Sequence, residues 1–156
     1  MHIAIGHRRL SIIDVEGGTQ PRLNEADDLH ISFNGEIYDY HDLRTSLENR
    51  GHVFRTHSDT ETIVHHFEDT NTDGFSALNG MFAFALFDRR NGELSRTLAR
   101  DRAGSKPLFY APLPCGGVVF SSEIFSLLQH ASISREIDQD ALDDYFLENT
   151  SRRRAQ

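Results

Sequence analysis

The run LHISFNGEIYDYHDLR, residues 29–44, joins two different periodicities through an Asn-Gly step. Its first five residues alternate apolar and polar side chains, which is typical of a half-buried strand. Tyr40, Leu43 and Leu47 then recur at helical spacing. Because an Asn-Gly step usually marks a β-turn, residues 34–36 are predicted to form a turn between a strand and a helix.

A second helix is predicted to begin at SDTE. Ser58 can cap it while Glu61 reaches back, which is the reciprocal arrangement of a capping box. Ile63 and Phe67 would form its core face. Asp59 would lie in the first turn, where the free N–H groups and the helix dipole favour a carboxylate.

The rest of the sequence is rich in strand signals. Residues 2–14 are rich in β-branched side chains and predict one strand or two short ones. Residues 16–28 have the composition of a loop, and residues 80–88 are apolar on both faces, as in a strand between two layers. Residues 89–93 and 106–123 predict two hairpins, and two helical patterns close the chain, the second opening with Asp138 as a cap. These patterns predict an α+β domain whose strands are mostly antiparallel.

Length and charge limit the organisation and the partners. A chain of 156 residues is expected to form one domain, over residues 1–148, followed by a basic, solvated tail over residues 149–156. The net charge of -8 disfavours a nucleic-acid partner, because phosphate binding needs clustered Lys and Arg. A single cysteine, Cys115, excludes an internal disulfide, and no apolar run approaches the roughly 18 residues of a membrane span. A cytoplasmic location without membrane contact is therefore predicted.

Seven segments carry a family resemblance, in the order GHRRLSIID, GGTQP, FNGEIYDYHDLR, FRTHSDTE, LNGMFAFALFD, ARDRAGSKPLFY and FSSEI. In this order and at these intervals they resemble the glutaminase domain of asparagine synthetases. That domain is a class II glutamine amidotransferase with the N-terminal-nucleophile hydrolase fold, a four-layered α/β/β/α sandwich. The resemblance runs from about Gly6 to Phe146 and implies this fold in truncated form.

The resemblance also implies a glutamine pocket. In the family, glutamine is held by the arginine and the backbone of the RRLSII strand, by the Asn-Gly-Glu segment and by the aspartate of SDTE. The matching residues here are Arg9, Ile12, Ile13, Asn34, Gly35, Glu36 and Asp59. Arg9 would pair with the α-carboxylate, and Glu36 and Asp59 would receive the α-ammonium or an amide N–H. Asn34 and the Gly35 N–H would form an oxyanion hole.

The printed sequence departs from the family at its start. Family members begin Cys-Gly-Ile, and that cysteine attacks the glutamine amide, whereas this sequence begins Met1-His2-Ile3. Cys115 stands in a Pro-Cys-Gly-Gly turn and has no free amine, so it is not expected to substitute. The synthetase domain is also absent from the sequence. The expectation is a domain that resembles a glutaminase, keeps the pocket and neither hydrolyses glutamine nor makes asparagine.

Three functional hypotheses remain open. The first is a binding or regulatory module for glutamine or a related amide or carboxylate, acting as a homodimer or with a synthetase-type subunit. The second is a repurposed enzyme in which His7 and Glu36 supply acid-base chemistry beside the Asn34 and Gly35 oxyanion hole. His7 alternates in register with Arg9, so both are expected on one face of a strand. The third is a fragment of an asparagine synthetase without a function of its own.

No metal site and no cofactor are predicted. His57, Asp59, Glu61 and His65 could be combined into a metal site, but capping already accounts for Glu61. Phe125 stands where the family commonly has lysine, and an exposed Phe at this position would indicate a new partner or a dimer surface.

Overall fold

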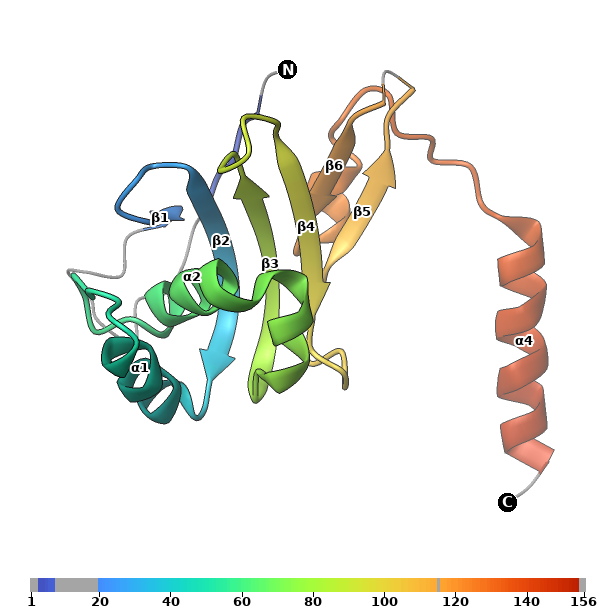
Figure 1. Cartoon of the computed structure of the whole chain (residues 1–156). Coiled ribbons are helices and arrows are strands. Elements are labelled where there is room, and N and C mark those ends of the chain that lie inside the picture. The colour runs from blue at the N-terminus through green and yellow to red at the C-terminus, as the bar shows by residue number, and fades with distance from the viewer. Residues whose placement is uncertain (1–2, 8–19, 115, 155–156) are drawn as a thin grey trace. The chain divides into compact units, whose positions relative to one another are not determined.

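The computed structural model describes residues 3–7, 20–114 and 116–154, which form parts of two compact units, Met1–Leu108 and Phe109–Gln156. All strand pairs among the described residues are antiparallel, so the predicted α+β class is confirmed. The first unit contains strands β1 (Arg22–Leu23), β2 (Leu29–Ile37), β3 (Gly80–Asp88) and β4 (Ser95–Arg100), helices α1 (Tyr40–Asn49) and α2 (Asp59–Thr70), and the 3-10 helix η1 (Asn71–Ala77). Its sheet has the order β1-β2-β3-β4 (Figure 1).

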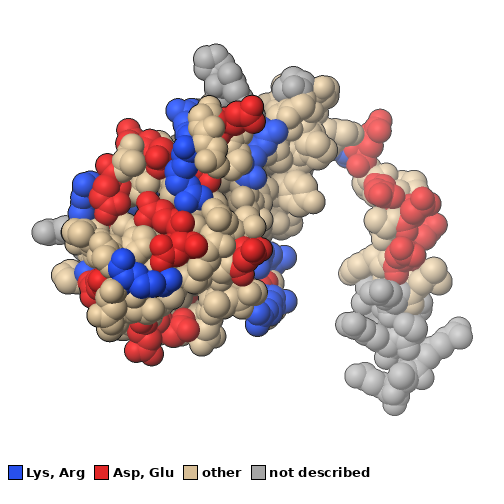
Figure 2. Space-filling model, in the orientation of Figure 1, with Lys and Arg blue, Asp and Glu red and all other residues tan. Residues whose placement is uncertain are grey.

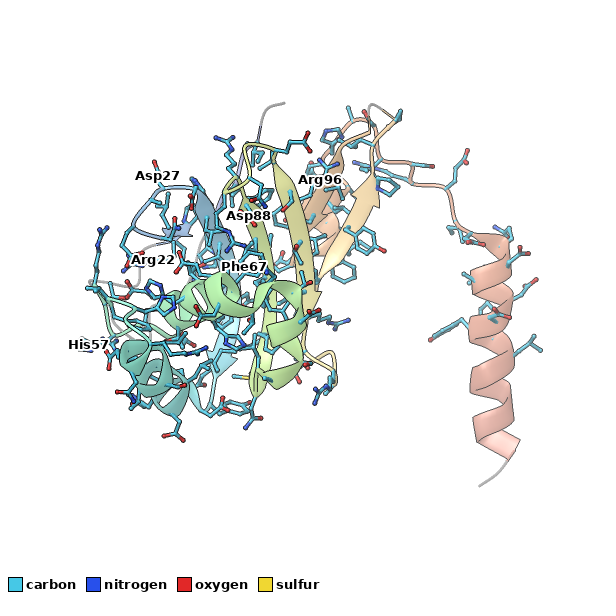
Figure 3. The ribbon with its side chains drawn as sticks, viewed as in Figure 1. Arg22, Asp27, His57, Phe67, Asp88 and Arg96 are labelled. Atoms are coloured by element: carbon cyan, nitrogen blue, oxygen red, sulfur yellow. The ribbon has the colours of Figure 1, made fainter. Side chains whose placement is uncertain are left out.

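The core of the first unit lies between the sheet and α2. Every second residue of β2 from Leu29 is buried up to Phe33, and Ile37 continues the set. These side chains pack with Ile63, Val64 and Phe67 of α2, and Figure 3 shows Phe67 between the helix and the sheet. The face of α2 predicted from the sequence is therefore confirmed.

The Asn-Gly step is not a turn, and that prediction is wrong. Strand β2 continues through it, with Asn34, Gly35 and Glu36 opposite Ala83, Phe82 and Met81 of β3. A Cβ atom on Gly35 would collide with the carbonyl oxygen of Met81, and one on Gly80 would collide with that of Glu36. The glycines therefore allow two backbones to approach closely within the sheet.

Strand β1 is only two residues long and pairs with only part of β2. Two side chains bind backbone groups on the rest of the outer edge of β2. The Gln20 side-chain amide accepts the Phe33 N–H at 2.7 Å and donates to the Phe33 carbonyl at 2.9 Å. Asp59 accepts the Ile37 N–H at 3.1 Å. Strand β1 itself lies where a loop was predicted. Residues 3–7 contain no strand, although one was predicted over residues 2–14, and residues 8–14 lie outside the described residues.

Ser58 caps α2 as predicted, accepting the Thr60 N–H at 3.2 Å. The prediction that the Glu61 carboxylate accepts the Ser58 N–H is wrong. The Glu61 carboxylate instead accepts the N–H groups of Arg55 and Thr56 at 2.9 and 2.8 Å, together with the Thr56 hydroxyl. Because Glu61 is buried, this carboxylate fixes the chain segment that precedes the helix.

The second unit contains the predicted hairpin of β5 (Phe109–Pro112) and β6 (Val118–Ser121), followed by the short helix α3 (Ile124–Leu127) and by α4 (Gln139–Arg154). Asp138 caps α4 as predicted, accepting two N–H groups. Phe125 is 77% exposed. Helix α4 runs across the predicted boundary at residue 149, and the tail beginning there stays a prediction.

Charge is mixed over the first unit. On the face shown in Figure 2, Lys and Arg are interspersed with Asp and Glu. None of the helices described here is both long enough and apolar enough to cross a membrane.

Asp101 links β3 to the loop after β4, and we expect it to govern acid stability. The Ser105 N–H lowers its pKa most; burial opposes this, and the N–H groups of Lys106 and Phe82 lower the pKa further, to about 2. Since the unperturbed value is 3.8, ionised Asp101 contributes stability above pH 4 that is lost as the pH falls towards 2.

Asp101→Asn is therefore expected to lower the Tm at pH 7 by several degrees and to flatten the pH dependence of stability between pH 4 and 2. Calorimetry at several pH values measures both effects. The exposed Asp73→Asn is the control. An acid transition that Asp101→Asn leaves unchanged would contradict the assignment.

Candidate functional site

The predicted site residues of β2 lie partly on one face of the sheet and partly at its outer edge. Side chains alternate along a strand, so Ser32, Asn34 and Glu36 occupy the sheet face opposite the one packed on α2. Asn34 is exposed and stands opposite Ala83 of β3. His7 joins this face, with its Nδ1 atom 3.2 Å from the Ser32 hydroxyl.

The backbone of Gly35 faces the outer edge of β2. In an antiparallel strand, alternate residues direct their N–H and C=O groups to the same side. Phe33 bonds to Gln20 on this side, and Ile37 bonds to Asp59. Gly35 lies between them, so its N–H points to the edge away from β3, as an oxyanion donor would require.

Asp59 brings a second element to this edge. It begins α2, is only 4% exposed, and holds the Ile37 N–H through its Oδ2 atom. Burial raises the pKa of Asp59 and the nearby charge of Glu36 raises it further, while hydrogen bonds from the N–H groups of Ile37 and Thr60 act in the opposite direction. A ligand cation beside these two carboxylates would offset the cost of burying and crowding their negative charge.

The site therefore combines opposite kinds of hydrogen-bonding group within one short stretch. The Asn34 amide and the Gly35 N–H are hydrogen-bond donors, whereas the carboxylates of Glu36 and Asp59 are acceptors. Arg9, Ile12 and Ile13, which the resemblance adds to this site, lie outside the described residues and stay predictions.

A pocket of about 490 Å³ lies elsewhere in the first unit. It is lined by residues that include Tyr38, Phe75, Met81, Arg100 and Asp101. Arg100 donates to the carbonyl groups of Lys106 and Gly104, and Asp101 accepts backbone N–H groups, so the charged groups of this pocket are engaged within the protein. None of the predicted site residues that the structure describes lines it.

The four residues considered from the sequence as a possible metal site do not form one set. The carboxylates of Asp59 and Glu61 accept backbone N–H groups at different places, and His57 is exposed at the margin of the unit (Figure 3). Within the described part of the chain, the fourth of these residues, His65, instead lies with His52 and Glu68, so that three potential ligand atoms gather there. The sequence signal for this cluster is the His-x-x-Glu spacing, which puts His65 and Glu68 on one helix face.

The antiparallel α+β fold belongs to the N-terminal-nucleophile hydrolase class. A solved structure of glutamine phosphoribosylpyrophosphate amidotransferase from B. subtilis, complexed with ADP and GMP, matches with a TM-score of 0.56 and 26% identity. The match covers 69% of this chain and 25% of that one.

The family follows from the sequence comparisons. A family model described as a glutamine amidotransferase domain matches residues 1–156, so the chain belongs to that family. Asparagine synthetase (glutamine-hydrolyzing) 3 of Bacillus subtilis strain 168 is 40% identical over 147 residues, or 93% of this chain and 24% of the relative. Asparagine synthetase (glutamine-hydrolyzing) 1 of the same organism is 44% identical over 92% of this chain and 22% of its own length. The chain thus spans about a quarter of these relatives or less.

Proposed function

We propose that this domain binds L-glutamine, or a closely related amino-acid amide, at the outer edge of β2. Glu36 and Asp59 receive the α-ammonium group, and the Asn34 amide and the Gly35 N–H hold the side-chain carbonyl. The observation that carries the proposal is the hydrogen bond from Ile37 to Asp59, since it joins the start of α2 to the strand that contains Asn34, Gly35 and Glu36.

The proposed role is the binding of glutamine and does not include its hydrolysis. The one thiol among these 156 residues is Cys115, which stands inside the sequence and so has no free α-amine to act as a base. A polypeptide limited to these residues is therefore expected to bind glutamine without releasing ammonia. The matched relatives are named as synthetases that hydrolyse glutamine, which supports a further proposal that the domain works with a synthetase-type partner.

Calorimetric titration with L-glutamine tests the binding site. Glu36→Gln and Asp59→Asn are each expected to weaken binding by about 10- to 100-fold, because each removes a charged acceptor of the ammonium group. Asp42→Asn is the matched control, since Asp42 lies in the first turn of another helix and is exposed. Arg9→Ala should also abolish binding. Unchanged affinity in Glu36→Gln and Asp59→Asn would exclude the proposed site, and ammonia release would exclude a purely binding role.

A second candidate rests on the contact between His7 and Ser32. A histidine 3.2 Å from a hydroxyl, on the strand face that also carries Asn34 and Glu36, supports the hypothesis of acid-base chemistry on another substrate. The His7→Ala variant distinguishes the two candidate functions. The binding module should retain its affinity for glutamine in His7→Ala, whereas a repurposed enzyme should ignore glutamine and lose turnover in that variant.

A further inference from the structure

Three potential ligand atoms meet at the side of α2, away from its first turn. His52 comes from the segment between α1 and α2, and His65 and Glu68 lie one helical turn apart on α2. His52 Nδ1 is 3.2 Å from His65 Nδ1 and 3.4 Å from Glu68 Oε2, and His65 Nδ1 is 2.8 Å from the same oxygen. The three atoms form a nearly equilateral triangle.

Hydrogen bonds among these three atoms leave their lone pairs incompletely paired with donors. His52 Nε2 lies 2.9 Å from a carboxylate oxygen of Asp69, so this nitrogen donates, and in a neutral ring Nδ1 then presents a lone pair to the triangle. Glu68 Oε2 presents another lone pair. A single N–H on His65 would have to serve both, whereas a cation between the three atoms would receive a lone pair from each.

The spacing of the atoms fits a metal ion. Metal–ligand bonds of about 2.0–2.2 Å, at tetrahedral or octahedral angles, separate neighbouring ligand atoms by about 2.8–3.6 Å. The three observed separations of 2.8, 3.2 and 3.4 Å fall within that range. Two imidazole nitrogens and one carboxylate oxygen are ligands that suit Zn²⁺, Co²⁺, Ni²⁺ and Fe²⁺ better than Ca²⁺ or Mg²⁺.

A second layer of contacts orients the ligands, as at protein metal sites. Asp69 holds His52 Nε2 and is itself paired with Arg50 at 2.7 Å. The other oxygen of Glu68 accepts from the Asn24 side chain at 2.9 Å. These contacts direct His52 Nδ1 and Glu68 Oε2 towards the triangle.

The third ligand is held by packing. The His65 side chain is 1% exposed, and its ring lies 4.5 Å, between centroids, from that of Phe54. Its Nε2 atom is buried, has no hydrogen-bond partner among the residues that the structure describes, and lies 3.6 Å from a Glu25 carboxylate oxygen. With a metal on Nδ1, Nε2 would carry the proton and face that carboxylate.

We propose that His52 Nδ1, His65 Nδ1 and Glu68 Oε2 bind one divalent transition-metal ion, of which Zn²⁺ is the representative, with water in the remaining positions. His52 and Glu68 are 16% and 20% exposed, which gives the ion a path from solvent. The ion ties the segment after α1 to α2, the helix that begins with Asp59. Its role is to stabilise that arrangement, and the site is separate from the glutamine site.

Metal titration of the untagged polypeptide, first stripped with a chelator, tests the site. Co²⁺ should bind with 1:1 stoichiometry and give visible d–d absorption bands, and Zn²⁺ should displace it and raise the Tm. His52→Gln and Glu68→Gln should each weaken Co²⁺ binding by at least about tenfold, and Asp69→Asn by about tenfold, because it removes the partner that orients His52. His41→Gln, at an exposed histidine of α1, should bind as the native protein does.

NMR of the native protein gives an independent readout that no folding defect can affect. Zn²⁺ should shift the Nδ1 resonances of His52 and His65 and leave His41 unchanged. The proposal is overturned if no ion binds below millimolar concentration, if those two resonances do not shift, or if folded His52→Gln and Glu68→Gln bind as tightly as the native protein.

Discussion

Replacing Phe84 with alanine is expected to lower the free energy of unfolding by about 3–5 kcal/mol, the usual cost of emptying a buried phenylalanine site. Phe84 is 1% exposed at the centre of β3. Its ring lies 5.6 Å from that of Phe82 and 5.0 Å, edge to face, from that of Phe75. Since a domain of this size is stable by about 5–15 kcal/mol, the variant should unfold at a far lower urea concentration.

Phe125→Ala is the matched control for Phe84→Ala. It removes the same atoms from a side chain that is 77% exposed, so its effect should stay within about 0.5 kcal/mol. Similar urea midpoints for the two variants would show that Phe84 is not the centre of the core.

Gly35→Ala is expected to cost about 3 kcal/mol or more and to abolish glutamine binding. The new Cβ atom would meet the Met81 carbonyl oxygen and the backbone of Phe82, so β2 and β3 must separate at the position that presents the Gly35 N–H. Urea unfolding measures the first effect and calorimetric titration the second.

Gly51→Ala separates the collision from the cost of the backbone conformation. Gly51 also has a positive φ, +102°, but a Cβ atom there would have no neighbour within 4 Å. That variant should cost only about 1–2 kcal/mol and should leave binding unchanged. If the two glycine variants behave alike, the close approach of β2 and β3 at Gly35 is not what selects glycine there.

The elements that local patterns define were predictable from the sequence. Helices α1 and α2, the tight hairpins and the Asp138 cap depend on periodicity, turn residues and capping within a few positions. The resemblance added the N-terminal-nucleophile hydrolase fold, because it relates segments that are far apart in the sequence. These features agree with the structure because each depends either on residues close together in the sequence or on segments that the resemblance already relates.

The wrong predictions concern residues whose hydrogen-bonding partners are distant in the sequence or lie outside the expected motif. Asn34 and Gly35 carry the local signal of a turn, but pairing with Ala83 and Phe82 extends the strand through them. Glu61 fits a capping box, yet the N–H groups of Arg55 and Thr56 compete successfully for its carboxylate.

The candidate site was predictable only in part. The residues Asn34, Gly35, Glu36 and Asp59 came from the resemblance, and the structure adds how β2 and α2 meet through Ile37. The His52, His65 and Glu68 cluster was missed, because the return of the chain after α1 brings His52 to a helix that begins later in the sequence.

The central claim is that the Asn34–Glu36 edge of β2, joined to Asp59, is an amino-acid site. Amide NMR of the isotope-labelled polypeptide, recorded while L-glutamine is added, tests it most directly. We expect the largest shifts at the Gly35 and Ile37 N–H groups, with smaller shifts at Thr60, and none of them when D-glutamine is added at the same concentration. Shifts confined to the pocket around Arg100 and Asp101, or no saturable shift at Gly35, would contradict the claim.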